Sequence, residues 1–220
     1  MIESVNVIGR GRVGSAVAAR LEERGVELRE DGAQVVLLCV PDSAIAAAAG
    51  GQTLVRSQWV GHTSGATPLS VIPHERRFGL HPLQTFDRSG DPRQLDGAFA
   101  AVTGETDGAR AVGRELAEAL GLEPFDLEEA DRALYHAGAA IASNYLVTLH
   151  RVASDLFDTV GAPPAALEPL MRRVIANGFE LTGPIARGDW ETVDRHLAAI
   201  RERRPAVEPL YRVLAEATAP

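Results

Sequence analysis

The sequence contains no lysine, and all 22 of its basic residues are arginine. Schiff-base chemistry and a lysine acting as general acid or base are therefore excluded. Cysteine is nearly absent as well: Cys39 is the only one, so no disulfide can form within the chain. No cluster of cysteine and histidine has the spacing of a zinc site, and we expect no metal. Cys39 lies in the apolar run 35–40, where a small core residue is expected.

The sequence also lacks an excess of positive charge and any long apolar run. Its formal net charge is −8, whereas nucleic acids and anionic membranes bind basic surfaces. No apolar run reaches the roughly 18 residues that a membrane-spanning helix needs. The first residues show no basic segment followed by a cleavage site. We therefore expect a cytoplasmic protein that binds neither nucleic acids nor membranes.

Up to about residue 128, short apolar runs alternate with segments of helical periodicity. The apolar runs predict strands at 5–8, 35–40, 59–62, 77–80, 98–103 and 122–127. The helical patterns lie at 12–23, 43–49 and 109–120. This alternation predicts an α/β fold with a mostly parallel sheet and helices on both faces.

Beyond residue 128 the pattern is helical. Residues 131–160 are expected to form one long helix that ends at 161–164, followed by helices at 165–180, 189–202 and 205–217. The long helix is rich in alanine and has apolar residues on several faces, which is typical of packing against a second subunit. We therefore expect an all-α domain over 129–220 that binds substrate and forms a homodimer through its helices.

A glycine-rich turn, Gly9-Arg10-Gly11-Arg12-Val13-Gly14, follows the first predicted strand and begins the first predicted helix. Glycines at this spacing give a tight turn, close approach of the backbone to a pyrophosphate, and close packing of helix on strand. The helix N-terminus adds N–H donors for an anion. The turn predicts a Rossmann-like dinucleotide-binding domain over 1–128, and a purely structural glycine turn is the alternative. The predicted cofactor contacts are Gly9, Gly11, Arg12, Val13 and Gly14.

The segment 26–34 is shorter than a dinucleotide-binding unit normally requires. It has room for one short strand and a turn, but not for the second strand and helix that complete the usual adenosine site. Glu27, Glu30 or Asp31 could contact a ribose hydroxyl and Arg29 a 2′-phosphate, or all of them could be solvated turn charges. The expected cofactor is NADP or NAD, and the short segment argues against a full adenosine site.

Polar residues follow the next two predicted strands. In an open α/β sheet, ligands gather at the carboxyl ends of the strands, so these residues are expected to contact the cofactor. Asp42 or Ser43 could instead cap the following helix, and 63–65 could be an ordinary turn. The predicted contacts are Val40, Pro41, Asp42, Thr63 and Ser64.

His81 follows the strand predicted at 77–80. Imidazole titrates near neutral pH, so a histidine that opens into the cleft suits acid–base catalysis. A proton acceptor beside a hydride donor is what the oxidation of an alcohol or hydroxy acid requires. The alternative is a histidine bonded to a backbone carbonyl where the chain turns at Pro82.

The helical domain supplies further candidates. His136 and Ser143 fall on one face of the long predicted helix, with Asn144 nearby, so His136 and Asn144 are candidate catalytic residues. They could instead be core residues bonded to the backbone. Arg187 is suited to clamp an anion. The predicted substrate contacts are Ser143, Thr182 and Arg187.

The order of six motifs resembles that of Rossmann-like proteins with a C-terminal DUF2520 helical domain. The motifs are GRGRVG, LLCVPDSAI, GHTSGA, GLHPLQTF, YHAGAAIASNYL and LTGPIARGDWETVDRHL, and the last four are the more specific. That family is similar to the 6-phosphogluconate dehydrogenase-like superfamily, alongside pyrroline-5-carboxylate reductase, prephenate dehydrogenase and ketopantoate reductase. The resemblance covers nearly the whole chain and implies an NADP-binding oxidoreductase of unestablished substrate.

The resemblance also bears on single residues. The His-Pro pair at 81–82 is similar to that of prephenate dehydrogenases, in which the histidine takes the hydroxyl proton as the hydride leaves, and this implies the same role for His81. Hydroxyacid dehydrogenases of the superfamily use a lysine four residues before an asparagine. If Asn144 matches that asparagine, Ala140 stands in place of the lysine, and that mechanism is not available.

Two hypotheses follow from the sequence. The first is an NAD(P)-dependent oxidoreductase that acts on a small anionic metabolite. The second is a non-catalytic ligand-binding or scaffold protein on a degenerate Rossmann core, and the short segment 26–34 motivates it. Titration with the cofactor separates the two.

Overall fold

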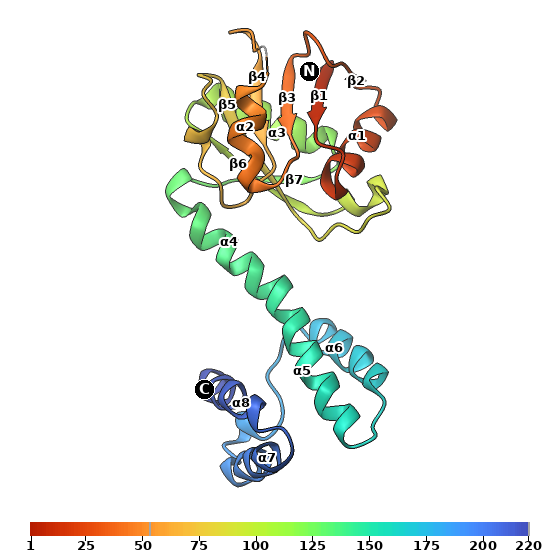
Figure 1. Cartoon of the computed structure of the whole chain (residues 1–220), viewed down its shortest axis with the longest axis vertical. Helices are drawn as coiled ribbons and strands as arrows, with labels where there is room; N and C mark the ends of the chain where they lie inside the picture. Colours follow the sequence, from red (N-terminus) through yellow and green to blue (C-terminus); the bar gives the residue numbers. More distant parts are fainter. Residues whose placement is uncertain (53, 220) are drawn as a thin grey trace. The chain divides into compact units, whose positions relative to one another are not determined.

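The structure is a computed structural model that describes residues 1–52 and 54–219. The chain divides into two compact units, Met1–Ile141 and Ala142–Pro220 (Figure 1). The first unit contains the sheet, and its last helix, α4 (Arg132–Ala140), follows the final strand. The second unit is helical.

The first unit is built on one sheet. Over the residues that the structure describes, the sheet has seven strands in the order β2-β1-β3-β4-β5-β6-β7. Neighbouring strands are parallel except β5 and β6, so the predicted mostly parallel sheet is confirmed. The strands are β1 (Ser4–Ile8), β2 (Glu27–Leu28), β3 (Val35–Leu38), β4 (Trp59–His62), β5 (Arg77–Leu83), β6 (Phe99–Gly104) and β7 (Glu123–Asp126).

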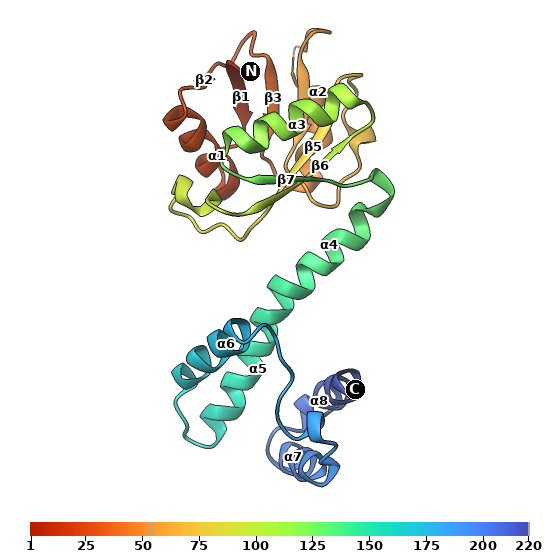
Figure 2. The same cartoon turned by 180° about the vertical axis from the view of Figure 1, so that it is seen from behind.

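Helices cover both faces of the sheet, as predicted. Along β3, Val35 and Leu37 join the core under α1 (Arg12–Glu23) and α3 (Asp107–Ala119). The alternate residues Val36 and Leu38 join a separate core with α2 (Ile45–Gly50). Every second side chain of a strand points to the same face, so a fully apolar strand serves two cores at once. Figures 1 and 2 show α2 on one face and α3 on the other.

The short segment before β3 has the predicted form. It contains the two-residue strand β2 and a bend, with no helix between β2 and β3 among the residues described there. Asn6 holds the bend by donating from its side-chain amide to the Glu30 carbonyl oxygen at 2.7 Å. The second strand–helix unit of a complete Rossmann fold is therefore truncated.

Strand β5 is longer than predicted, and this places His81 within a strand rather than in a loop. The strand continues to Leu83, with His81 opposite Ala101 and Pro82 opposite Ala100 on β6. The pairing with β4 ends at Gly79, so beyond that residue β5 has β6 as its only paired neighbour. A proline has no N–H to donate and is tolerated where one side of the strand is open. The alternative interpretation, in which the chain turns at Pro82, is therefore wrong.

The long helix predicted at 131–160 is a continuous helical run with an irregular centre. It consists of α4, a π-helix at Ile141–Tyr145, and α5 (Leu146–Thr159). The angular step per residue is smaller in a π-helix than in an α-helix. The helical-wheel argument that put His136 and Ser143 on one face therefore does not hold across this segment.

The second unit is a set of helices with a small core of its own. Its helices are α5, α6 (Leu167–Ala176), α7 (Trp190–Arg203) and α8 (Glu208–Thr218). Asp189 caps α7, because its carboxylate accepts a hydrogen bond from the Thr192 backbone N–H at 3.1 Å. Val193, Leu197 and Ala215 are the buried residues between α7 and α8.

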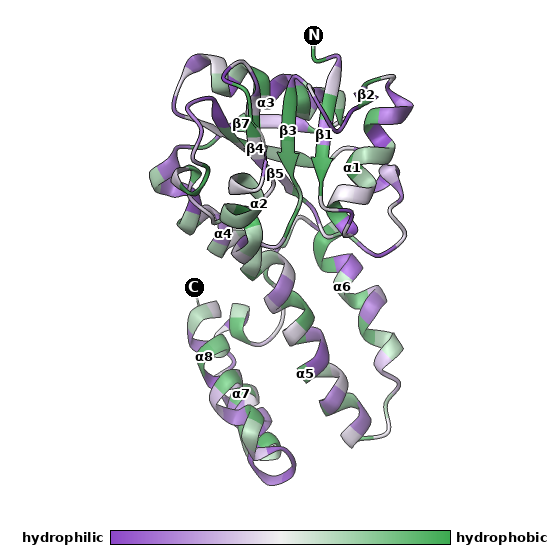
Figure 3. Cartoon of the chain, turned by 45° about the horizontal axis from the view of Figure 1, so that its top comes forward, coloured by the Kyte–Doolittle hydropathy of each residue, from purple (hydrophilic) through white to green (hydrophobic). Residues whose placement is uncertain are grey.

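Much of the apolar surface of the second unit is exposed. Figure 3 shows hydrophobic residues interspersed along α5 and α6. Among the helices of residues 1–52 and 54–219, none combines the length and the apolar character that a membrane span requires. The exposed large apolar side chains of this unit include Tyr145, Leu146, Val147, Leu149, Leu170, Val174, Ile175 and Phe179.

Candidate functional site

Two glycines of the first turn are required by the protein itself. Gly9 has φ +95°, and a Cβ there would lie 2.5 Å from the Cys39 carbonyl oxygen. A Cβ on Gly14 would overlap the Gly9 carbonyl oxygen. These two residues provide the tight turn and the close packing of α1 on β1. Cys39 itself is buried, as predicted, and burial raises the pKa of its thiol to about 12.

Gly11 differs from the other two glycines. It is the N-cap of α1 with φ −73°, a conformation open to any residue, and no atom lies within 4 Å of the position of a Cβ. Neither packing nor backbone conformation in this chain requires a glycine there. The first turn of α1 contains no acidic residue, and the exposed Arg10 and Arg12 flank Gly11. The helix N-terminus thus offers backbone donors and positive charge to an anion.

The segment after β3 lies beside the glycine turn. A Cβ on Gly9 would come within 2.9 Å of Val40 Cγ1. Asp42 begins a short 3-10 helix, Asp42–Ala44, whose N-cap is Pro41, and the N-cap of α2 is Ala44. No side chain caps either start, so Asp42 and Ser43 do not act as helix caps. Both side chains are exposed.

The segment after β4 is tied into the fold. The Thr63 backbone N–H donates to the Leu38 carbonyl oxygen at 3.1 Å. The Ser64 hydroxyl donates to Thr67 Oγ1 at 2.9 Å and accepts from the Thr67 backbone N–H at 2.9 Å. The Ser64 side chain is therefore used within the turn, whereas Thr63 is half-buried.

Two rows of aligned residues lie on the face of the sheet that carries α2, and one of them contains His81. Strand pairing aligns His62, Gly79 and Thr103 across β4, β5 and β6. It aligns His81, Ala101 and Phe125 across β5, β6 and β7. Phe78 and Leu80 belong to the core on the opposite face. Because successive side chains of a strand alternate between the faces, Gly79 and His81 face the α2 side.

Helix α4 is anchored over the first row by Arg132. This arginine is 2% exposed, and it donates to Thr103 Oγ1 at 3.0 Å and to the Ser64 carbonyl oxygen. A Cβ on Gly79 would lie 2.6 Å from one guanidinium nitrogen, so the missing side chain makes room for the arginine. The Glu129 carboxylate lies 3.9 Å from Arg132 Nε. Arg132 therefore fixes the first turn of α4 against the sheet.

The next turn of α4 brings two aromatic side chains to His81. The Tyr135 hydroxyl lies 2.7 Å from His81 Nδ1. The ring centroids of His81 and His136 are 5.8 Å apart in an edge-to-face arrangement. A Cβ on Gly65 would lie 2.6 Å from His136 Cδ2 and 3.0 Å from His81 Nε2. His81, Tyr135, His136 and Gly65 are therefore one cluster, at the same edge of the sheet as the glycine turn.

Burial controls the protonation of this cluster. It lowers the pKa of His81 to about 4, and the neighbouring His136 and Arg132 act in the same direction. It raises the pKa of Tyr135 to about 12, against a smaller opposing effect of Arg132. At neutral pH both side chains are uncharged. Perturbed titration of this kind is frequent at functional sites.

The remaining predicted residues lie in the second unit. Asn144 is exposed in the π-helix, and its backbone carbonyl oxygen accepts from the Thr148 hydroxyl at 3.3 Å. Ser143 is half-buried in the same segment. Thr182 and Arg187 are exposed, Arg187 at the end of a short 3-10 helix, Ile185–Arg187.

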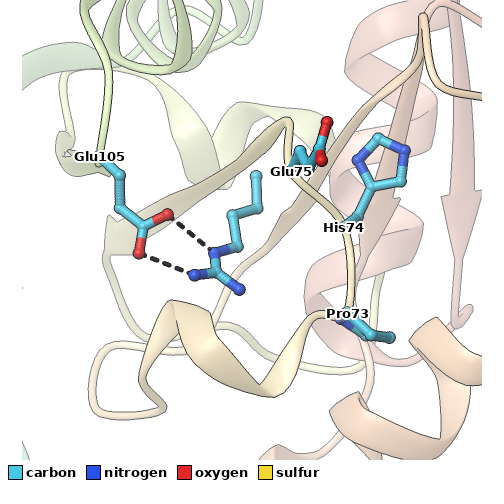
Figure 4. Close-up of a pocket in the computed structure, with 5 residues that line it drawn as sticks. Pro73, His74, Glu75 and Glu105 are labelled. Atoms are coloured by element: carbon cyan, nitrogen blue, oxygen red, sulfur yellow. Dashed lines mark hydrogen bonds and ion pairs between the residues drawn. The ribbon is translucent and has the colours of Figure 1, made fainter.

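A surface pocket of about 410 Å³ lies away from this cluster. It is lined by Pro73, His74, Glu75, Arg77 and Glu105 (Figure 4). Arg77 begins β5, and its guanidinium forms two hydrogen bonds with Glu105 at 2.8 and 3.0 Å. The pocket is therefore at the amino end of β5, and it contains none of the predicted site residues.

Sequence reasoning did not connect Arg132, Tyr135 or His62 with His81. A buried arginine one turn before a Tyr-His pair marks the anchored end of α4, but Arg132 looks like a surface residue in the sequence. Tyr135 adjoins His136, yet its contact with His81 depends on the packing of α4 on β5. His62 is fully buried, and neither of its ring nitrogens forms a hydrogen bond with the described residues.

Comparison with known families decides where the chain belongs. The model of the domain of unknown function DUF2520 matches residues 98–218, more than half of the chain. The chain belongs to the DUF2520 family. The match begins next to β6 and includes the second unit up to residue 218, so the glycine turn lies outside it. No curated protein matches the sequence.

Solved structures share the fold over the whole length of the DUF2520 chain. An NADP oxidoreductase candidate from Bacteroides fragilis is 20% identical, with 99% of this chain and 98% of that chain covered and a TM-score of 0.80. A protein from Thermotoga maritima is 21% identical, with 97% and 96% covered and a TM-score of 0.78. Prephenate dehydrogenase from Aquifex aeolicus, solved with hydroxyphenyl propionate and NAD⁺, is 16% identical, with 99% and 96% covered and a TM-score of 0.58. At these identities the likeness shows the fold, which confirms the Rossmann-like prediction.

Proposed function

We propose that the protein is an NAD(P)-dependent oxidoreductase that acts on a small anionic metabolite. The observation that carries the proposal is the open position at Gly11, where a glycine serves no packing or conformational need of the chain itself. A glycine is needed there when a pyrophosphate approaches the backbone. The names of the similar solved structures support the same reaction class.

The residues present fit the pyrophosphate of a dinucleotide. Backbone N–H groups of Arg12 and Val13 at the start of α1 would hold the phosphates, and the Arg10 and Arg12 side chains add positive charge. When bound, the nicotinamide supplies or accepts a hydride. The adenosine end has a smaller site, because β2 has only two residues. Arg29 beside it forms an ion pair with Glu27 at 2.5 Å, and a 2′-phosphate would compete for that arginine.

In this proposal the His81 cluster acts on the reacting group of the substrate. His81 would hold a proton against the reacting oxygen, and His136 beside it would restrict the approach of the substrate. Asn144, Ser143, Thr182 and Arg187 are assigned to the substrate from their side-chain chemistry and their positions in the sequence alone. Their amide, hydroxyl and guanidinium groups suit a carboxylate.

We propose a homodimer formed through the helices of the second unit. Exposed large apolar side chains are numerous on α5 and α6, whereas the buried residues of this unit are few. Exposed apolar surface of this extent is characteristic of an interface between subunits. No nucleic acid is expected as a partner of a chain with net charge −8.

A non-catalytic binding protein is the second candidate. The two-residue strand β2 favours it, because the part of the fold that normally reads the adenosine ribose is reduced to a bend. In that case the glycine turn would bind a smaller anion or nothing. The arrangement of the His81 cluster would then serve packing alone.

Paired measurements of binding and turnover test the proposal. Fluorescence titration with NADPH and NADH measures binding, and consumption of NADPH with a panel of small oxo acids and cyclic imines measures turnover. We expect saturable binding and at least one substrate. His81→Asn should abolish turnover and keep the cofactor affinity of the wild type. The upper end of typical Michaelis constants is about 1 mM. If neither cofactor binds at that concentration, the proposal is wrong and the second candidate is favoured.

A further inference from the structure

Tyr135 is held against the sheet by a hydrogen bond and by two aromatic contacts. Its hydroxyl is 2.7 Å from His81 Nδ1, and its ring packs edge-to-face against His81 at 5.5 Å and Phe125 at 5.9 Å. Phe125 and His81 lie in one row across the sheet, and the tyrosine ring sits over that row. Arg132, three residues earlier on α4, is buried and bonded to the sheet. The position of the Tyr135 hydroxyl is therefore fixed by the contacts of its own ring and by the attachment of α4 to the sheet through Arg132.

The contact leaves one nitrogen of His81 for a ligand. Nδ1 is occupied by Tyr135, whereas Nε2 lies on the side of Gly65 and His136. Among the residues described, none forms a hydrogen bond with Nε2. A neutral imidazole carries its proton on one nitrogen only, and the partner of the other nitrogen selects which.

The direction of the Tyr135–His81 hydrogen bond follows from the chemistry of the two groups. A phenol is the better donor and an unprotonated imidazole nitrogen is the better acceptor, so the hydroxyl donates to Nδ1. Burial keeps both groups uncharged at neutral pH, because it raises the pKa of Tyr135 and lowers that of His81, so the bond joins a neutral phenol and a neutral imidazole. The proton of the neutral ring then resides on Nε2.

We propose that Tyr135 is a positioning residue that holds His81 as the Nε2–H tautomer, so that His81 presents a hydrogen-bond donor to an acceptor oxygen or nitrogen of the substrate. This rests on the proposed function for the identity of the site, and it narrows the substrate class. A resting donor suits a carbonyl or imine that is about to be reduced, because the acceptor atom gains negative charge when the carbon is reduced. A resting base would suit an alcohol instead.

The chain contains a matched control for this contact. His196 and Tyr211 of the second unit form the same pair, with Nδ1 and hydroxyl 2.7 Å apart and ring centroids 6.0 Å apart. His196 is exposed, and no predicted site residue belongs to that pair. Tyr211→Phe therefore removes an equivalent hydrogen bond without touching the His81 cluster.

Nitrogen-15 spectra of the histidine side chains test the tautomer in the full-length protein without ligand. Long-range ¹H–¹⁵N correlations, with His81 assigned from His81→Gln, should show a protonated Nε2 and an unprotonated Nδ1 at pH 7.5. Tyr135→Phe keeps the ring and should give a mixture of tautomers at His81. Tyr211→Phe should change the His196 signals alone. A protonated Nδ1 in the wild type, or a tautomer unchanged in Tyr135→Phe, overturns the proposal.

Turnover separates this proposal from the proposed function. Tyr135→Phe should lower kcat about tenfold, the loss of one good hydrogen bond, and leave cofactor affinity unchanged. Tyr211→Phe should leave both unchanged. If the tautomer is as proposed but neither cofactor binds, the oxidoreductase function fails and the positioning of His81 stands. If the cofactor binds but Nδ1 carries the proton, the positioning fails and the function stands.

Discussion

Glycine makes room for polar side chains at two positions beside the candidate site. Gly79 leaves space for the Arg132 guanidinium, and Gly65 leaves space for the rings of His81 and His136. Neither glycine has a positive φ, so the small size of the residue is what matters. The packing of these polar side chains therefore requires a residue without a side chain at positions 65 and 79.

Replacement of Gly65 tests this dependence. Gly65→Ala should displace the two histidine rings and destabilise the first unit by about 1–3 kcal/mol, the usual cost of overpacking. Denaturant unfolding followed by Trp59 fluorescence in a Trp190→Phe background reports on the first unit. Gly138→Ala is the control, because a Cβ there meets nothing within 4 Å and the helix should gain up to about 1 kcal/mol. Equal stability of Gly65→Ala and the wild type would contradict the packing argument.

His62 makes the stability of the first unit depend on pH. Burial, with Arg132 acting in the same direction, lowers the pKa of His62 to about 4 in the folded state, against 6.5 for the free side chain. The unfolded chain therefore binds the proton first. The contribution of His62 is complete above pH 6.5 and is lost as the pH falls from 6.5 to 4, by about 3 kcal/mol. His81 contributes in the same range and with the same sign.

Denaturant unfolding at several pH values checks this prediction. The wild type should lose stability between pH 6.5 and 4.5. His62→Leu replaces a fully buried ring whose nitrogens lack partners, so its loss of stability over that range should be roughly half that of the wild type. The same pH dependence in both proteins would show that His62 is not the responsible group.

At the scale of elements, α4 is the piece that completes the site, and one arginine attaches it. Arg132 bonds to residues after β4 and within β6, and it lies over Gly79 of β5. Arg132→Met should leave the buried Thr103 hydroxyl and Ser64 carbonyl without their donor. We expect a destabilisation of about 2–4 kcal/mol and faster amide exchange in the first turn of α4.

A half-buried arginine that bonds to a surface carboxylate serves as the control for Arg132. Arg110 makes two hydrogen bonds with Glu128 at 3.1 Å on the surface, and Arg110→Met should change the stability by less than about 1 kcal/mol. Loss of similar size in both variants would indicate that burial of Arg132 does not matter. Preserved exchange rates in α4 of Arg132→Met would contradict its anchoring role.

The sequence predicted the elements well and their contacts only in part. Apolar runs and glycine spacing located β1, β3, β4 and α1 because they depend on neighbours in sequence. The length of β5 was missed, since the pairing of Pro82 depends on where β4 ends. The contacts of Arg132 with Thr103 and of Tyr135 with His81 were not predicted, because these partners lie 29 and 54 residues away in sequence. The burial of His62 likewise depends on how the elements pack.

At the scale of the whole molecule, the second unit has the composition of an interface. Leu170 and Val174 are exposed on one side of α6, at 59% and 44%. The proposed homodimer predicts that sedimentation gives twice the 23.4 kDa chain mass. Leu170→Glu with Val174→Glu should give the monomer, because each buried charge would oppose association. Arg172→Glu, on the same helix and already exposed, is the charge control. A wild-type monomer at micromolar concentration would contradict the homodimer.

Titration of three proteins with NADPH tests dinucleotide binding at the glycine turn most directly. Gly11→Ala adds one methyl group to a position that the chain leaves open, and Gly50→Ala adds one at the end of α2, where a Cβ also meets nothing within 4 Å. We predict saturable binding to the wild type and to Gly50→Ala, and binding weakened at least about tenfold in Gly11→Ala, because the methyl group takes the place of the pyrophosphate. Equal affinity of all three proteins, or no binding by the wild type, would contradict the binding of a dinucleotide at the glycine turn.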